Sequence, residues 1–172
     1  MANINLKEVK FTEVLNDYIN LFPKGAFLTT KQEDKINTMT MGWGNVGYIW
    51  GKNIIMVPVR KSRYTHQLIE NSNYFTVSVP LNNQYQKELK FCGTKSGLNY
   101  DKIAELKLPL YKTELTDVPI ISGNDLHFIA KIVYKQDMKL ENLSQDYQNK
   151  NYPEADMHSF YYGEIIKVYQ EV

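Results

Sequence analysis

Period-two alternation of apolar side chains is the feature that most narrows the folds open to this chain. Residues 36–41 and 126–134 alternate in this way, which places successive side chains on opposite faces of a strand. A polar turn over 31–35 separates the first segment from the apolar run 26–30, so a β-hairpin is predicted there. The chain is therefore expected to build mainly antiparallel sheet.

Three further segments have the composition of strands, namely 74–79, 118–121 and 158–169. A fourth, 53–59, is almost wholly apolar, as in a strand that is buried on both faces. Within it, Pro58 marks an edge, a bulge or the strand end.

Helical spacing occurs before the first strand segment and between later ones. Four helices are predicted: one between Thr12 and Pro23, one over 63–70 with Ser62 as its N-cap, one through Tyr85, Leu89 and Cys92 with Gly93 as its C-cap, and one over 101–106. Neither an internal repeat nor a linker-like composition break is visible. Residues 1–172 are therefore expected to form one domain, mainly β, as an antiparallel barrel with inserted helices.

The charge balance disfavours two classes of partner. The chain has 20 basic and 19 acidic side chains and a formal net charge of +1, so no strong field favours nucleic acid or an anionic membrane surface. No segment approaches the ~18 apolar residues of a membrane span, and the first residues lack the apolar core of a signal peptide. The single cysteine, Cys92, excludes an internal disulfide and a cysteine-based zinc cluster. A cytoplasmic protein with a small-molecule ligand and no metal is expected.

The segment PVRKSRYT, residues 58–65, is the first candidate binding site. It leaves a buried strand and enters a helix start with three cations and the hydroxyls of Ser62 and Thr65. Unpaired N–H groups at a helix start favour an anion, so a phosphate fits there. The alternative is that Ser62 only caps the helix while the cations are solvated.

The segment FCGTKSG, residues 91–97, is the second candidate. Its two glycines allow close approach of a ligand to the backbone, and Thr94, Lys95 and Ser96 supply donors. The alternative is an ordinary helix end followed by a surface loop. The Walker pattern of nucleotide triphosphatases is absent, and Cys92 is better explained as a packed side chain than as a nucleophile.

The strand and turn over residues 37–45 form the third candidate. Alternation places Asn37, Met39 and Met41 on one face and Thr38 and Thr40 on the other. Glycines on both sides of Trp43 expose the backbone, whose N–H groups can meet a planar heterocycle edge-on. The alternative is an ordinary strand with a bulge.

Taken together, these segments resemble the flavin reductase-like, FMN-binding split-barrel family, and especially its flavoredoxin-like branch. The matching segments, in order, are PKGAFLTTK at 23–31, NTMTMGWG at 37–44, VRKSRYT at 59–65, FTVSVP at 75–80, FCGTKSG at 91–97 and HSFYYGEI at 158–165. The resemblance covers nearly the whole chain, and it implies a split β-barrel in a single FMN-binding domain over 1–172.

The resemblance also implies which residues bind the cofactor: Asn37, Thr38, Met39, Thr40, Gly42, Trp43, Arg60, Lys61, Ser62, Tyr64, Thr65, Cys92, Gly93, Thr94, Lys95, Ser96 and Gly97. Of these, Arg60, Ser62, Tyr64 and Thr65 are assigned to the phosphate end, and Thr38, Met39 and Thr40 to the isoalloxazine ring. The family's ring-contacting motif has Ser before its Trp, whereas this chain has Gly42, so a hydroxyl contact is not expected there.

The implied activity is that of an NAD(P)H-dependent flavin oxidoreductase in which the flavin carries the redox chemistry. This agrees with the lack of a recognisable acid–base pair, since His127 and His158 are explained as packing or interface residues. One alternative is a flavin-binding electron carrier without a productive nicotinamide site. A split barrel of the pyridoxine-phosphate-oxidase or haem-binding kind fits the loop motifs less well.

A homodimer is also expected. The chain has 13 Tyr, 7 Phe and 2 Trp residues, more than one small barrel core readily accommodates, and such residues are enriched in buried interfaces. A small barrel fills its own interior with side chains, so a flavin would lie outside it, near a subunit boundary. The alternative is that the tyrosines of the last strand face solvent.

Overall fold

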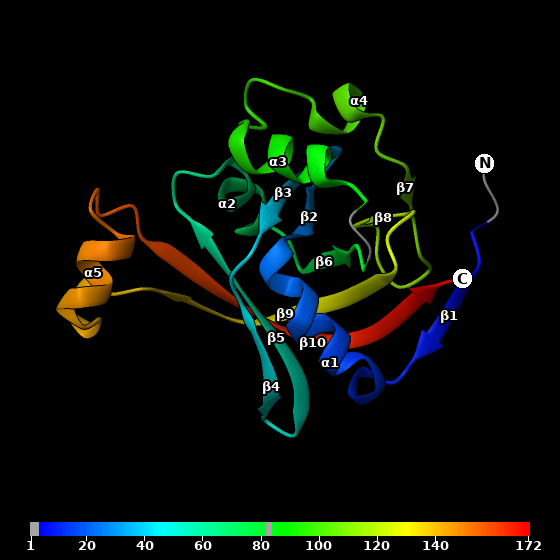
Figure 1. Ribbon diagram of the computed structural model, residues 1–172, viewed down its shortest axis with the longest axis horizontal. Helices are drawn as coiled ribbons and strands as arrows, with labels where there is room; N and C mark the ends of the chain where they lie inside the picture. Colours follow the sequence, from blue (N-terminus) through cyan, green and yellow to red (C-terminus); the bar gives the residue numbers. More distant parts are fainter. Residues whose placement is uncertain (1–3, 82–83) are drawn as a thin grey trace.

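The computed structural model describes residues 4–81 and 84–172, without the side chains of residues 21 and 22. Its elements are β1 (Leu6–Val9), α1 (Phe11–Leu21), η1 (Phe22–Lys24), β2 (Ala26–Gln32), β3 (Lys35–Met41), β4 (Asn45–Ile49), β5 (Lys52–Arg60), α2 (Tyr64–Ile69), β6 (Tyr74–Val79), α3 (Gln86–Thr94), α4 (Lys102–Leu106), β7 (Leu110–Tyr111), β8 (Ile120–Ile121), β9 (Leu126–Asp137), η2 (Leu140–Asn142), α5 (Gln145–Asn151) and β10 (His158–Glu171). Figure 1 shows α2, α3 and α4 gathered beside β2 and β3, with α1 lying across the sheet.

One antiparallel sheet contains most of the strands, in the order β3-β2-β6-β9-β10-β5-β4, with β1 paired to β10. The predicted hairpin is present, because β2 and β3 pair from Ala26 with Met41 to Gln32 with Lys35. The sheet does not close, since β3 and β4 form its two ends. The prediction of a mainly β split barrel with inserted helices is confirmed.

The barrel interior is filled by side chains from both halves of the chain. Phe75, Phe128 and Tyr161 are fully buried there, as period-two alternation on β6, β9 and β10 requires. Helix α1 covers one opening of the barrel, where the ring of Tyr18 packs edge-on against Phe128 at 5.0 Å between centroids. A second apolar cluster lies under α3, around Phe27, Leu89 and Cys92. The interior therefore has no room for a large ligand.

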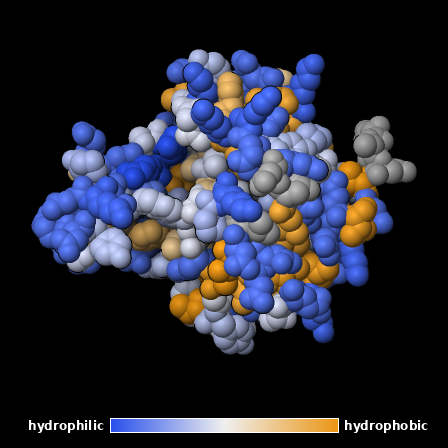
Figure 2. Space-filling view, viewed as in Figure 1, coloured by the Kyte–Doolittle hydropathy of each residue, from blue (hydrophilic) through white to orange (hydrophobic). Residues whose placement is uncertain are grey.

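Strands β9 and β10 extend beyond the barrel and carry η2 and α5 between them. We call residues 138–157 the arm. The arm projects from one side of the molecule, and in the same view its surface is hydrophilic (Figures 1 and 2). Its return strand begins at His158, which pairs with Arg60 at the end of β5. This register places the base of the arm beside the β5–α2 turn.

Some local predictions need correction. Ser62 does not cap α2: Arg63 occupies that position, without a side-chain cap hydrogen bond. Gly93 lies inside α3, whose C-cap is Lys95. Strands β1 and β4 and helix α5 were not predicted, because their short or polar sequences lack a clear period. None of the helices in the described residues combines the length and the apolar character needed to cross a membrane.

Candidate functional site

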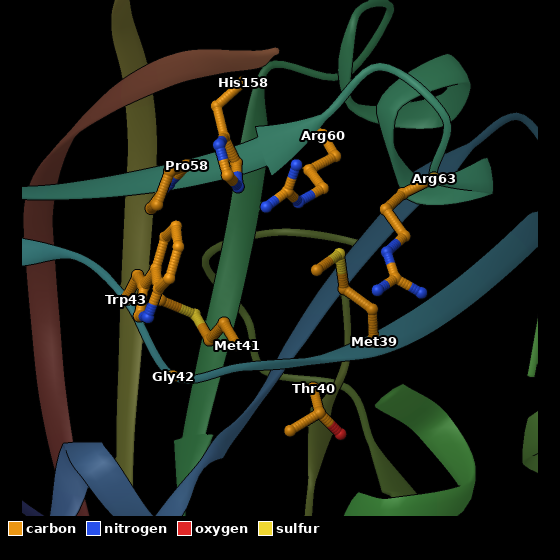
Figure 3. A pocket seen from close by; sticks show the side chains of 9 residues that line it. All are labelled: Met39, Thr40, Met41, Gly42, Trp43, Pro58, Arg60, Arg63 and His158. Carbon is orange, nitrogen blue, oxygen red and sulfur yellow. The ribbon is translucent and has the colours of Figure 1, made fainter. Parts of the chain in front are cut away.

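A cavity of about 190 Å³ opens where the barrel is split, between the ends of β3 and β5. Its lining comes from three elements and two connecting turns: Met39, Thr40, Met41, Gly42, Trp43, Pro58, Arg60, Arg63 and His158. Figure 3 shows the side chains of Met39, Met41, Trp43, Arg60, Arg63 and His158 around one space. We call this space the split cavity.

The backbone of β3 faces the split cavity because β3 is an end strand. The Thr38 carbonyl accepts a hydrogen bond from the buried Lys102 ammonium at 3.0 Å, so it points away from β2. The N–H and C=O of a residue in an antiparallel strand point the same way, and alternate residues share that direction. The backbone groups of Thr40 therefore also point away from β2, at the cavity. They form a donor and acceptor edge that a planar heterocycle can match.

The threonine side chains of β3 serve the protein interior instead. Thr38 is fully buried, and its hydroxyl donates to the Leu28 carbonyl. The Thr40 hydroxyl donates to the Leu89 carbonyl at 2.5 Å, on the face opposite Met39 and Met41 (Figure 3). A ligand in the split cavity would thus meet the backbone of Thr40 and the side chain of Met39.

Trp43 is the side chain that the neighbouring cavities have in common. It is 49% exposed and lines the split cavity, a 590 Å³ cavity against α5 and a 490 Å³ cavity against α1. The split cavity alone is smaller than the roughly 300–1,000 Å³ of typical ligand sites. A ligand of flavin size would therefore extend past Trp43 into a neighbouring cavity.

Arg60 closes one end of the split cavity. Its guanidinium donates to the Asp156 carbonyl at 2.6 Å and to the Asn151 carbonyl at 2.9 Å, and lies over the rings of Tyr152 and Trp43 at 5.1 and 6.0 Å. A guanidinium has five N–H donors, so these two bonds leave others for a ligand. Lys61, its neighbour, instead pairs with Asp137 at 2.5 Å.

Ser62 already holds an anion. Its hydroxyl and its backbone N–H donate to the two carboxylate oxygens of Asp156, at 2.6 and 3.2 Å. The Arg60 guanidinium lies 3.9 Å from the same carboxylate. The sequence predicts that this turn binds an anion. In the structure, the anion that it binds is a carboxylate from the base of the arm.

Four residues of the split cavity were not among the predicted contacts: Met41, Pro58, Arg63 and His158. Arg63 stands within the predicted motif and donates to the Gly93 carbonyl at 3.0 Å. Burial, and secondarily Arg60, lower the pKa of His158 to about 4, so its imidazole is neutral at neutral pH. In the sequence, the one sign that His158 belongs to the site is its position at the start of the HSFYYGEI segment, residues 158–165.

A second group of predicted residues lines a separate cavity. Asn37, Tyr64 and Gly97 line a 450 Å³ cavity, and the Asn37 amide donates to the Thr65 hydroxyl at 2.7 Å. A Cβ at Gly97 would stand 2.2 Å from Asn37 Oδ1 and 2.6 Å from the Tyr64 ring. The close approach that Gly97 permits is therefore one between protein segments.

In the part of the chain that the structure describes, residues 92–96 make their contacts with other protein residues and do not line the split cavity. Cys92 is buried in the apolar cluster under α3, where burial raises the pKa of its thiol to about 11. The Thr94 hydroxyl donates to the Lys90 carbonyl at 2.8 Å, Lys95 lies over the Tyr100 ring, and Ser96 accepts from the Leu98 N–H. Gly93 contributes its carbonyl to Arg63. This segment supports the site by fixing Arg63.

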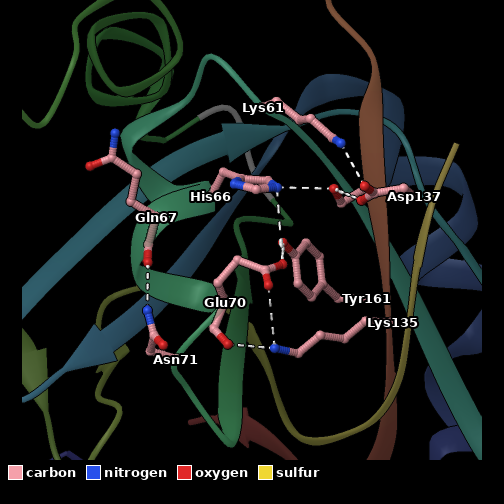
Figure 4. A network of polar contacts seen from close by, with 9 residues as sticks. Lys61, His66, Gln67, Glu70, Asn71, Lys135, Asp137 and Tyr161 are labelled. Carbon is pink, nitrogen blue, oxygen red and sulfur yellow. Dashed lines mark hydrogen bonds and ion pairs between the residues drawn. The ribbon is translucent and has the colours of Figure 1, made fainter.

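A polar network ties α2 to the strands that carry the arm (Figure 4). His66 contacts the Ser159 hydroxyl at 2.9 Å, and Ser159 donates to Asp137 at 2.6 Å. Tyr161 donates to Glu70 from within the barrel. Because Ser159 is buried and its hydroxyl donates a hydrogen bond to a carboxylate, this network positions α2 and offers no nucleophile. His127 is likewise buried, between Ser78 and Glu171.

Comparison with known proteins gives one family. The model described as flavin reductase like domain matches residues 20–171. An uncharacterized protein of Archaeoglobus fulgidus is 30% identical over 122 residues, which cover 71% of this chain and 68% of the relative.

Solved structures share the fold. Flavoredoxin from Methanosarcina acetivorans has a TM-score of 0.69 at 24% identity, covering 86% of this chain and 68% of its own. An FMN-binding domain of a flavin reductases-like enzyme from Shewanella baltica has a TM-score of 0.73 at 15% identity, covering 99% and 80%. The NADH:FAD oxidoreductase of Streptomyces globisporus has a TM-score of 0.64 at 18% identity, covering 98% and 89%.

Proposed function

This chain belongs to the flavin reductase-like family, and from that premise we propose that it binds FMN and transfers electrons from NADH or NADPH to free flavin or another acceptor. The observation that carries the proposal is the split cavity, which brings together an outward-facing strand backbone, an exposed indole and Arg60, with the anion-holding Ser62 close to Arg60 in the same turn. These are the groups that a planar heterocycle with a phosphate tail requires.

The proposed placement follows the cavity from end to end. The backbone of Thr40 meets the edge of the ring, Trp43 contacts its face, and Arg60 with Ser62 holds the phosphate. Met39 and His158 complete the wall, and the neutral His158 adds no further charge beside the two arginines. The compact anion site, with no dinucleotide fingerprint in the sequence, supports FMN over FAD.

Bound FMN would supply the hydride-accepting chemistry, and the residues of the chain would bind and orient it. Arg60 and Ser62 fix one end, so the ring can shift little along β3. The 590 Å³ cavity between Trp43 and α5 is where we place the nicotinamide or the acceptor. The fold shared with the NADH:FAD oxidoreductase supports a nicotinamide donor.

The test is anaerobic stopped-flow mixing of the FMN-loaded protein with NADH or NADPH. We expect rapid loss of the oxidised-flavin absorbance with at least one of them, and we expect chromatography of heat-released cofactor to yield FMN. Mainly FAD, or no flavin even after reconstitution, would contradict the proposal.

An electron carrier is the second candidate, favoured by the similarity of fold to flavoredoxin. Such a protein would bind FMN and be reduced by dithionite, yet neither nicotinamide would bleach it. The two functions share the site and differ only in this readout.

We further propose that residues 1–172 act as one FMN-binding domain, in a homodimer and in the cytoplasm. Strands near both ends of the chain, β1 and β10, pair in one sheet, which supports the first part. Cys92 is buried as a free thiol, which agrees with a reducing compartment.

A further inference from the structure

The anion-holding turn beside the split cavity is occupied by a side chain of the protein itself. Asp156 comes from the base of the arm, 94 residues away from Ser62 in the sequence, and both of its carboxylate oxygens accept hydrogen bonds from Ser62. Its side chain is 29% exposed, so solvent and solutes can reach it. Lys61 does not compete for the carboxylate, because it pairs with Asp137.

The backbone around Asp156 is held in place. The Lys61 N–H donates to the Met157 carbonyl at 3.0 Å, and the next residue, His158, pairs with Arg60. On the other side, Ala155 has φ = 53°, a left-handed conformation that is unfavourable for an alanine. The chain accepts this conformation directly before Asp156, where it directs the side chain to Ser62. Release of the carboxylate requires only a rotation of the side chain.

A carboxylate and a phosphate need the same partners. Each satisfies an N–H, a hydroxyl and a guanidinium, and each forms charge-assisted bonds with them. Two anions do not share such a turn without mutual repulsion, which disfavours the charged form of both. A phosphate that reaches Ser62 must therefore displace the carboxylate of Asp156 or lie beside it.

We propose that Asp156 is a specificity-determining residue that competes with the flavin phosphate for Ser62 and Arg60, and so reduces the preference of the site for FMN over riboflavin. This inference rests on the proposed function. It adds that the wild-type turn is satisfied without a phosphate, and that the arm sets how strongly a phosphorylated flavin is preferred.

The test compares the affinities for FMN and for riboflavin, by titration of the apoprotein, in the wild type and in Asp156→Asn. The amide keeps an acceptor for the Ser62 hydroxyl and removes the charge. We expect the variant to bind FMN about ten-fold more tightly or better, with riboflavin unchanged. The matched control is Glu154→Gln, which removes an exposed carboxylate from the same loop and should change neither affinity.

Three results would overturn the inference: an unchanged FMN affinity in Asp156→Asn, an equal gain in Glu154→Gln, or weaker binding of both flavins, which would make Asp156 a structural clasp. If neither flavin binds to any of the proteins, the proposed function fails as well. Asp156→Ala replaces Asp156→Asn if the latter does not fold.

A second comparison tests the route of the effect. In a Ser62→Ala background, the gain from Asp156→Asn should fall to less than half, because the hydroxyl, which makes the shortest bond to the Asp156 carboxylate, is gone. A gain of full size in that background would show that Asp156 acts only through its long-range charge, and would overturn the competition for Ser62.

Discussion

Arg60 has two kinds of partner at once, backbone carbonyls at the base of the arm and aromatic rings beside the split cavity. Its remaining N–H groups are the ones that a phosphate can use. The Arg60→Ala variant should therefore weaken FMN binding by about 1.5–3 kcal/mol. Riboflavin, which has no phosphate, serves as the internal reference in the same titration. Equal losses for both ligands would mean that Arg60 is structural.

Trp43 should give the opposite pattern. Its indole borders three cavities and lies nearer the proposed ring than the phosphate end. Replacing it with Ala removes an aromatic contact worth about 0.5–1.5 kcal/mol, and this loss should be the same for FMN and riboflavin. Fluorescence titration of both ligands measures it. A loss of affinity for FMN alone would contradict the proposed contact between Trp43 and the flavin ring.

His158 makes stability depend on pH. Its pKa is lowered from 6.5 to about 4 in the folded protein, first by burial and then by Arg60. Below pH 6.5 the unfolded chain takes up a proton that the folded chain refuses, so stability falls as the pH falls. Between pH 7 and 5 this residue should cost up to about 2 kcal/mol of the free energy of unfolding.

His158→Gln removes that titration while it keeps a polar partner for the Tyr152 hydroxyl, which lies 2.8 Å from His158. Urea unfolding at the two pH values should show a smaller loss in the variant than in the wild type. The same loss in both proteins would show that other groups cause the fall in stability between pH 7 and 5.

At the scale of elements, β10 approaches β6 and β9 closely at Gly163. A Cβ at Gly163 would stand 2.7 Å from the Cβ of Ala130 and from the ring of Phe75. Gly163→Ala should therefore destabilise the protein by about 1–3 kcal/mol through overpacking. Gly47→Ala, in β4 with no atom within 4 Å of the added Cβ, is the control and should stay within about 0.5 kcal/mol. Equal denaturation midpoints for the two variants would refute the packing argument.

At the scale of the whole molecule, an aromatic face remains exposed beside the β4–β5 hairpin. Trp50 is 59% exposed and contacts Tyr134 and Tyr162 at 5.9 and 6.3 Å between ring centroids. Tyr161, by contrast, is fully buried in the barrel, so only part of the tyrosine-rich ending is available to a partner. This face is our proposed contact in a homodimer.

Light scattering of the FMN-loaded protein should give a mass of twice 20.1 kDa, about 40 kDa. Trp50→Lys should lower it toward the monomer mass, because a charge in the centre of the contact would be desolvated. A wild-type monomer that still holds FMN would contradict the dimer, and a dimer unaffected by Trp50→Lys would place the contact elsewhere.

The sequence alone determined several of the strands and the chemistry of individual segments. Period two in 36–41 predicts β3, and the composition of 26–30 and 74–79 predicts β2 and β6, because the side-chain pattern of a strand is local. The cations and hydroxyls of 60–65 indicate an anion, and the structure places an anion there, in the form of Asp156. These properties depend on neighbours in the chain, so they can be read without the fold.

Only the tertiary structure decided which distant residues meet. Asp156 reaches Ser62, and His158 reaches the split cavity, because the β5–β10 register brings the base of the arm to the β5–α2 turn. Gly97, in the loop between α3 and α4, approaches Asn37 on β3 and Tyr64 on α2, because α2 packs against β3. A polar segment such as the arm has no hydrophobic periodicity from which its position in the fold could be predicted. The pairing of strands that are far apart in the chain depends on the whole sheet.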